Sequence, residues 1–455
     1  MKRLMMIIFL FLFALPIFSE DLGDVADSDD EKPTKVEKTK EDGGLGDVSD
    51  DDKKDEEDNE EKEEDGDKEE KEVKFNLNGY VKVNIYSDQY ENSYNTKKLQ
   101  NANTGAITQL KFEGNITGKA HFFSIFNLGY NQYDGTADEH AKLTPRMVEA
   151  YVDLYFNWLT IRAGHQIITW GKTDGFMVPT DRINPRDYTY LSSEYEDLKL
   201  GVTSLALNMF FSGQKFEVIW IPTFEPNVLS SNALITKTEV EKKIENSSIA
   251  VQLSGTLGKL DYALSYVFGF DLNPDFDNTT GIFTKHNRIH SPGLDFSIPV
   301  SAISIKGSGA LFFTEDFEGE KILYKNSYGT YLLGIEYLKG SNMIGIQVGQ
   351  KYVFKHKKAT DATEIMLQKY LYEEDDIMNI FTGTINLNFL RGDALNLTLM
   401  FTATCNMDFE NWNYAIQPVF TYKVTNGVEV VLGASFQDQL DLKRTTFMFE
   451  TKYSF

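Results

Sequence analysis

"FNLNGYVKVNIYS", residues 75–87, alternates apolar and polar side chains with a period of two. The alternation predicts a β-strand with one apolar and one polar face. The fold of the chain then depends on which solvent meets each face. The two faces are formed by Phe75, Leu77, Val81, Val83 and Ile85 on the apolar side, and by Asn76, Asn78, Lys82 and Asn84 on the polar side.

The same alternation recurs to the end of the chain, for example in "LDYALSYVFGF" (260–270) and "WNYAIQPVFTYKV" (412–424). These segments are about 10 to 13 residues long, nearer the roughly 9 to 11 residues of a tilted membrane strand than the 5 to 6 of soluble sheets. We therefore interpret the apolar faces as lipid-facing and the polar faces as lumen-facing. A mean hydropathy of -0.35 excludes a helical membrane protein and fits a barrel in which every second residue is polar.

The segments number eighteen, and the gaps between them alternate between long and short, as in outer-membrane barrels. The sequence therefore predicts an all-β fold, a transmembrane up-and-down antiparallel β-barrel. Sixteen strands remain the alternative, because the division of residues 198–224 is ambiguous. An even count returns both termini to the periplasm. The predicted strands are 75–87, 107–119, 121–132, 146–156, 158–169, 198–211, 214–224, 247–257, 259–270, 288–299, 302–314, 327–338, 342–354, 377–389, 394–405, 412–424, 427–437 and 444–455.

Two segments precede the predicted barrel domain, residues 73–455. Residues 1–19 combine two basic residues, an apolar run and Ser19 at a plausible cleavage point, which predicts a secretory signal peptide. Residues 20–72 carry 27 acidic and 9 basic side chains and almost no aliphatic ones, which predicts a disordered acidic tail in the periplasm. The only cysteine of the chain is Cys405, so no intramolecular disulfide can form.

The C-terminal residues "TFMFETKYSF" place an aromatic residue at almost every second position and end on Phe455. This pattern resembles the C-terminal recognition signal of bacterial outer-membrane barrels, which the barrel-assembly machinery reads. The resemblance implies the bacterial outer membrane as the location, membrane lipid as the surroundings and the assembly machinery as a partner. The signal residues are Phe447, Phe449, Tyr453 and Phe455.

Between the fifth and sixth predicted strands lies "HQIITWGKTDGFMVPTDRINPRDYTY", residues 165–190, which is rich in both turn-forming and large apolar residues. With the strand before it, this segment resembles the R-x-G-x-Q-x-x-x-W-G and N-P-x-D pattern of porin-like barrels. The resemblance implies a passive channel whose third external loop folds into the lumen. The matching residues are Arg162, Gly164, Gln166, Trp170, Gly171, Asp174, Asn184, Pro185 and Asp187.

The same segment carries charges of both signs, which predicts a pore constriction with a transverse field that selects ions by sign. Trp170, Phe176, Met177 and Ile183 are expected to pack the segment on the barrel wall. The alternative is a solvated surface loop held by its own ion pairs. The predicted constriction residues are Lys172, Asp174, Asp181, Arg182, Arg186 and Asp187.

The sequence favours a channel for passive or weakly selective diffusion of small hydrophilic solutes, because about 16 to 18 strands leave a water-filled lumen. A surface adhesion or binding barrel and a specific uptake channel are the alternatives. We find no catalytic motif and expect no enzyme activity, cofactor, metal site or nucleic-acid partner, while a homo-oligomer stays open. Residues 355–376 are expected to hold a short helix carrying Ile365, Met366, Tyr370 and Leu371.

Overall fold

The computed structural model describes eleven stretches between residues 74 and 455. The predicted signal peptide (1–19) and acidic tail (20–72) lie outside the described residues, as does Phe176. The described stretches are 74–92, 95–116, 118–130, 143–175, 177–190, 192–229, 240–278, 280–321, 324–371, 375–439 and 442–455.

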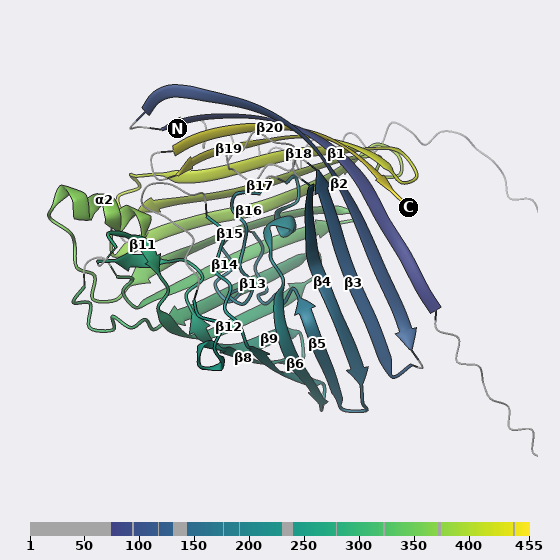
Figure 1. Ribbon diagram of the computed structural model, residues 1–455, viewed down its shortest axis with the longest axis horizontal. Helices are drawn as coiled ribbons and strands as arrows, with labels where there is room; N and C mark the ends of the chain where they lie inside the picture. Colours follow the sequence, from purple (N-terminus) through teal and green to yellow (C-terminus); the bar gives the residue numbers. More distant parts are fainter. Residues whose placement is uncertain are drawn as a thin grey trace, which may run out of the picture. The chain divides into compact units, whose positions relative to one another are not determined.

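Eighteen antiparallel strands form one closed sheet, which confirms the predicted barrel and its count (Figure 1). Each strand pairs with its neighbours in the chain, and β1 closes the ring by pairing with β20. The ring consists of β1 (Lys74–Asn92), β2 (Asn95–Ile116), β3 (Ala120–Tyr130), β4 (Leu143–Tyr155), β5 (Leu159–Gln166), β6 (Val202–Phe211), β7 (Gln214–Ile221), β8 (Ser248–Leu257), β9 (Leu260–Phe270), β12 (Arg288–Val300), β13 (Ile303–Phe312), β14 (Tyr328–Lys339), β15 (Asn342–Val353), β16 (Ile377–Phe389), β17 (Leu395–Asn406), β18 (Asn413–Thr425), β19 (Val428–Gln439) and β20 (Leu442–Ser454).

The apolar faces of the strands point outward and the polar faces point into the barrel, the reverse of a soluble protein. On β1, Phe75 is 68% exposed and Val83 is 48% exposed, whereas the alternate residues Lys82 and Asn84 are 4% and 1% exposed. An outward apolar belt of this kind is what a hydrocarbon environment requires. The face assignment made from residues 75–87 is therefore confirmed.

One predicted gap is wrong. Residues 88–106 were expected to form the first long loop, but β1 and β2 continue as a hairpin through them, pairing Ser87 with Ala102 and Gln89 with Gln100. The closing hairpin of β19 and β20 likewise pairs as far as Gln439 and Leu442. A strand that projects beyond its neighbours can be polar on both faces, so the period of two that marks membrane strands is lost there.

The remaining odd-numbered connections are longer and lie at the same end of the barrel. Two of them carry a hairpin or an α-helix, namely the β10 (Asp275–Asp277) and β11 (Ile282–Lys285) hairpin and helix α2 (Ala362–Tyr370), which lie together in Figure 1. Asp361 caps α2 by accepting from the Thr363 and Glu364 backbone N–H groups at 2.9 and 3.3 Å. The predicted helix is confirmed. The hairpin and helix share a small core of Phe276, Phe283, Leu367 and Leu371.

Two short 3₁₀ helices, η1 (Tyr195–Leu198) and η2 (Ile244–Asn246), complete the described elements. None of the helices in the described stretches is long and apolar enough to cross a membrane.

Candidate constriction in the barrel lumen

The connection between β5 and β6, residues 167–201, folds into the barrel instead of standing in solvent. Irregular teal segments of this part of the chain run inside the ring of strands in Figure 1. Its side chains contact lumen-facing residues on strands all around the ring, as described below. The predicted strands 158–169 and 198–211 leave residues 170–197 between them, so the loop is a few residues longer at each end than predicted.

Asn184 fastens the two ends of the loop together. Its side-chain oxygen accepts a hydrogen bond from the Ile168 backbone N–H at 2.7 Å, and its Nδ2 donates to the Leu200 and Gln166 carbonyls at 2.6 and 3.3 Å. The Gln166 side chain in turn donates to Ser204 Oγ on β6 at 2.9 Å. Asn184 therefore defines the geometry of the loop, because it satisfies the Ile168 N–H and the Leu200 carbonyl, two backbone groups outside the strands.

The start of the loop packs on the inner wall of the barrel through a cluster of apolar side chains. Ile168, Trp170 and Ile183 form one buried cluster with wall residues that include Ala206, Ile219, Ala250 and Val267. The indole Nε1 of Trp170 donates to Glu217 on β7 at 3.0 Å. The expected packing of Trp170 and Ile183 on the wall is confirmed, and the solvated surface loop is excluded as its alternative.

The first arm of the loop, residues 171–182, reaches the far side of the barrel. Asp174 forms an ion pair with Lys306 on β13 at 3.1 Å, and its carbonyl accepts from Gln347 Nε2 on β15 at 3.0 Å. A Cβ at Gly175 would lie 2.8 Å from Thr382 Oγ1 on β16. Because β16 is the ninth strand from β5 in either direction around the ring, the arm spans the full width of the lumen.

Further along, Thr180 Oγ1 donates to Asp295 on β12 at 2.8 Å. Two glycines make the path of this arm and the strand before it sterically feasible. Gly171 has a φ of 111°, and a Cβ there would lie 2.3 Å from Val178 Cγ1. Gly164, with a φ of 142°, sits so close to β4 that a Cβ would lie 2.2 Å from the Ala150 carbonyl oxygen.

The six predicted constriction residues fall into three groups. Asp181 and Arg186 are buried and pair with each other at 2.7 Å, and Asp181 also pairs with Lys199 at 3.1 Å. Asp187 accepts from the Thr189 N–H at 3.0 Å and from the Thr189 hydroxyl, within the loop. A third group, Lys172, Asp174 and Arg182, is only half-buried and lies on the first arm.

The guanidinium of Arg182, in this last group, packs over an aromatic ring of the barrel wall. Its guanidinium carbon is 4.5 Å from the centroid of the Phe312 ring on β13, and its Nε donates to the Pro179 carbonyl at 3.2 Å. The Phe312 ring does not neutralise the charge of Arg182, which acts on the Asp271 carboxylate but, unlike that of Arg186, forms no salt bridge within the described stretches.

The second arm, residues 188–198, runs to the seam where β1 meets β20. Ser193 Oγ donates to Glu450 on β20 at 2.8 Å, and Asp197 pairs with Lys82 on β1 at 3.8 Å. Burial raises the pKa of the Tyr195 phenol, so this side chain stays neutral. Sequence reasoning missed the contacts of this arm, because its wall partners Glu450 and Lys82 lie far from the motif in the chain.

Of the remaining predicted residues, Arg162 and the C-terminal signal residues lie on the wall, and Pro185 lies in the loop. Arg162 forms a bidentate pair with Asp153 at 2.7 and 2.8 Å and covers the Tyr151 ring at 4.0 Å, near the short turn at 156–158. The Pro185 carbonyl accepts from the Leu200 N–H at 2.8 Å. The predicted C-terminal signal residues, Phe447, Phe449, Tyr453 and Phe455, are 40–53% exposed.

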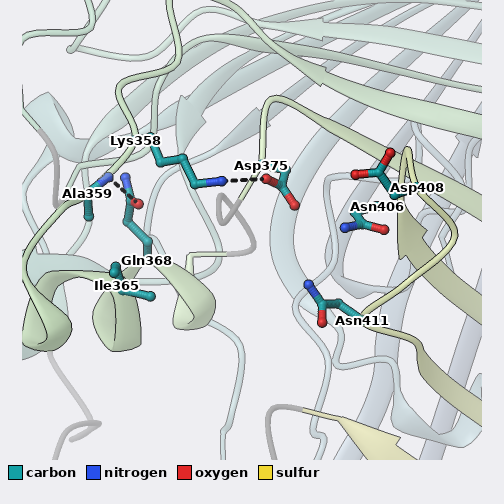
Figure 2. Close-up of a pocket in the computed structure, with 8 residues that line it drawn as sticks. All are labelled: Lys358, Ala359, Ile365, Gln368, Asp375, Asn406, Asp408 and Asn411. Atoms are coloured by element: carbon teal, nitrogen blue, oxygen red, sulfur yellow. Dashed lines mark hydrogen bonds and ion pairs between the residues drawn. The ribbon is translucent and has the colours of Figure 1, made fainter.

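A separate polar pocket lies outside the lumen, between α2 and the β17–β18 connection (Figure 2). Lys358 pairs with Asp375 across it at 3.2 Å, and Gln368 accepts from the Ala359 N–H at 3.0 Å. Among the described stretches, no group of three or more His, Cys, Asp or Glu residues is arranged to hold a metal ion.

Comparison with solved structures identifies the same architecture in other chains. OccK8 (OprE) of Pseudomonas aeruginosa aligns with a TM-score of 0.52 and 9% identity over 83% of this chain and 98% of its own. The outer membrane protein opdK of Pseudomonas aeruginosa gives 0.52 and 10% over 84% and 98%. OccAB3 of Acinetobacter baumannii gives 0.51 and 10% over 83% and 99%. The likeness shows a shared barrel fold. No protein-family model and no curated protein matches the sequence.

Proposed function

We propose that the protein is an outer-membrane channel for passive or weakly selective diffusion of small hydrophilic solutes, with the loop of residues 167–201 as its constriction. The observation that carries the proposal is the first arm of that loop, which joins β5 to β16 across the lumen. An eighteen-strand ring with a polar inner face leaves a water-filled path, and an internal loop narrows it. The fold shared with the outer membrane protein opdK supports this location.

The barrel's ends support an orientation with both termini in the periplasm. Tyr80 on β1 pairs with Ser454 on β20, so the chain enters and leaves the ring at the same end, where the short turns lie. Short turns face the periplasm in outer-membrane barrels. The outward aromatic residues at that end, including Phe455, would then present the signal that the assembly machinery reads.

Conductance of the refolded protein in a planar lipid bilayer tests the proposal. We expect stepwise current increments that vary linearly with voltage, because the inner face carries polar side chains along most strands. A separate measurement of heat-modifiable migration establishes that the inserted protein is folded. Folded protein that inserts without conductance would reject the channel and favour the surface binding barrel.

A further inference from the structure

A row of large side chains crosses the outer surface of the barrel near its long-loop end. The strand register aligns Trp220 on β7 with Ile249 on β8, Ile249 with Phe268 on β9, and Phe268 with His290 on β12. His290 in turn pairs with Phe313, just after β13. Such a girdle of aromatic residues marks the level of the membrane–water interface on a barrel.

The girdle faces outward. Leu264 and Leu294 lie on the same faces of β9 and β12 as Phe268 and His290, and they are 50% and 49% exposed. Below the row, towards the middle of the strands, this face of β12 is apolar, with Leu294, Phe296 and Ile298. His290 and Arg288 are therefore ionisable side chains at the upper edge of a lipid-facing surface.

Arg288 is held in place by two rings and two carbonyls. Its guanidinium carbon lies 4.4 Å from the Phe270 ring centroid and 5.0 Å from that of Phe268. Its NH1 and NH2 groups donate to the Ser247 and Glu245 carbonyls, respectively. The nearby Glu315 carboxylate accepts the Arg288 backbone N–H at 3.1 Å, and within the described stretches the guanidinium forms no ion pair.

His290 is likewise fixed. Tyr266 OH and His290 Nδ1 are 2.6 Å apart, and the imidazole lies 4.7 Å from the Phe268 ring. When Tyr266 donates this bond, the hydrogen of the neutral imidazole is on Nε2. His290 is exposed, so Nε2 can donate to a ligand beside the barrel.

We propose that Arg288 and His290 bind the phosphate of an anionic lipid in the membrane leaflet at the long-loop end. A fixed charge on a lipid-facing surface is costly unless it meets a counter-charge. The Glu315 carboxylate bonds the Arg288 backbone N–H and forms no ion pair with the guanidinium, which leaves the headgroup phosphate as the counter-charge of the side chain. The acyl chains would then lie on the apolar surface that includes Leu264 and Leu294. The assignment of this level to a headgroup rests on the membrane location proposed above.

Native mass spectrometry of the folded barrel in detergent micelles tests the site. We expect phosphatidylglycerol to remain bound more strongly than phosphatidylcholine of the same acyl chains, since only the former carries net charge. Arg288→Gln should weaken phosphatidylglycerol retention about fivefold, because one basic residue near an anionic surface contributes ~1 kcal/mol. His290→Gln should weaken it as well, by removing the imidazole donor.

Lys339→Gln is the matched control, because Lys339 is an exposed cation at the opposite, short-turn end of β14. Equal retention of both lipids, or an equal loss in Lys339→Gln and Arg288→Gln, would overturn the proposal. Binding of inorganic phosphate that depends on Arg288 as strongly as lipid binding does would also overturn it in favour of a free-anion site. Conductance of Arg288→Gln should match that of the unchanged protein, so a failed lipid site and a failed channel are distinguishable.

Discussion

Arg182 and Arg186 are four positions apart on one loop, yet the structure gives their charges different consequences. Arg186 is buried against Asp181, whereas Arg182 lies on the Phe312 ring and is half-buried. Arg182→Gln should shift the reversal potential in a salt gradient towards cation selectivity, by up to about fivefold in permeability ratio. This follows because a unit charge 4 Å from an ion in water contributes ~1 kcal/mol.

The matched control variant is Arg186→Gln. It removes a charge that is buried in an ion pair with Asp181, so it should affect the packing of the loop more than the ion path. We expect it to shift the reversal potential less than Arg182→Gln does. The reverse order of effects would show that Arg182 lies away from the ion path. The sequence identified both arginines as candidates but did not predict that their environments differ. The difference arises from contacts with Asp181, Lys199 and Phe312, and Phe312 is distant in the chain.

The loop of residues 167–201 has two arms, and hydrogen bonds of Asn184 join its two ends. The first arm spans the lumen between β5 and β16, while Asn184 fastens the loop's ends independently of it. Replacing residues 172–180 with a short glycine–serine linker should therefore raise single-channel conductance severalfold, because the narrowest section in series dominates the resistance. Planar-bilayer recordings at one salt concentration measure the change.

The same replacement at residues 407–411, in the β17–β18 connection, serves as the control and should leave conductance unchanged. Unaltered conductance after removal of the first arm would exclude it as the constriction. The motif that includes Trp170, Gly171 and Asn184 predicted that a loop enters the lumen. It did not predict the second arm, because Ser193 and Asp197 belong to no pattern with Glu450 or Lys82.

For the whole molecule, the strand positions followed from the period of two alone. The eighteen strands of the barrel repeat this pattern, and each is delimited by turns or loops. The ambiguous stretch at 198–224 resolves into β6 and β7, joined by a tight turn in which Ser212 and Gly213 have φ of 47° and 76°. Periodicity failed at the β1–β2 and β19–β20 hairpins, whose strands pair beyond their predicted ends, since no lipid selects the side chains there.

One buried carboxylate joins the seam of the ring to the loop. Glu450 on β20 is 1% exposed and accepts hydrogen bonds from Tyr86 OH at 2.6 Å and Ser193 Oγ at 2.8 Å, with Lys82 Nζ 3.8 Å away. Glu450→Ala should therefore destabilise the barrel by about 3 kcal/mol, because it leaves Lys82 without one of its counter-charges and two hydroxyls without their acceptor.

The midpoint temperature of heat-modifiable migration on gels measures this loss, with Glu241→Ala as the control. Glu241 also carries a lysine partner, Lys243, but its side chain is 70% exposed, so its removal should leave the midpoint almost unchanged. Ser193→Ala keeps the Tyr86 and Lys82 contacts of Glu450 and the Asp197–Lys82 pair, and removes only the hydrogen bond from Ser193 to Glu450. If the Ser193–Glu450 hydrogen bond stabilises the seam, Ser193→Ala should lower the midpoint, but by less than Glu450→Ala does. A midpoint equal to that of the unchanged protein would show that ring closure is independent of this hydrogen bond.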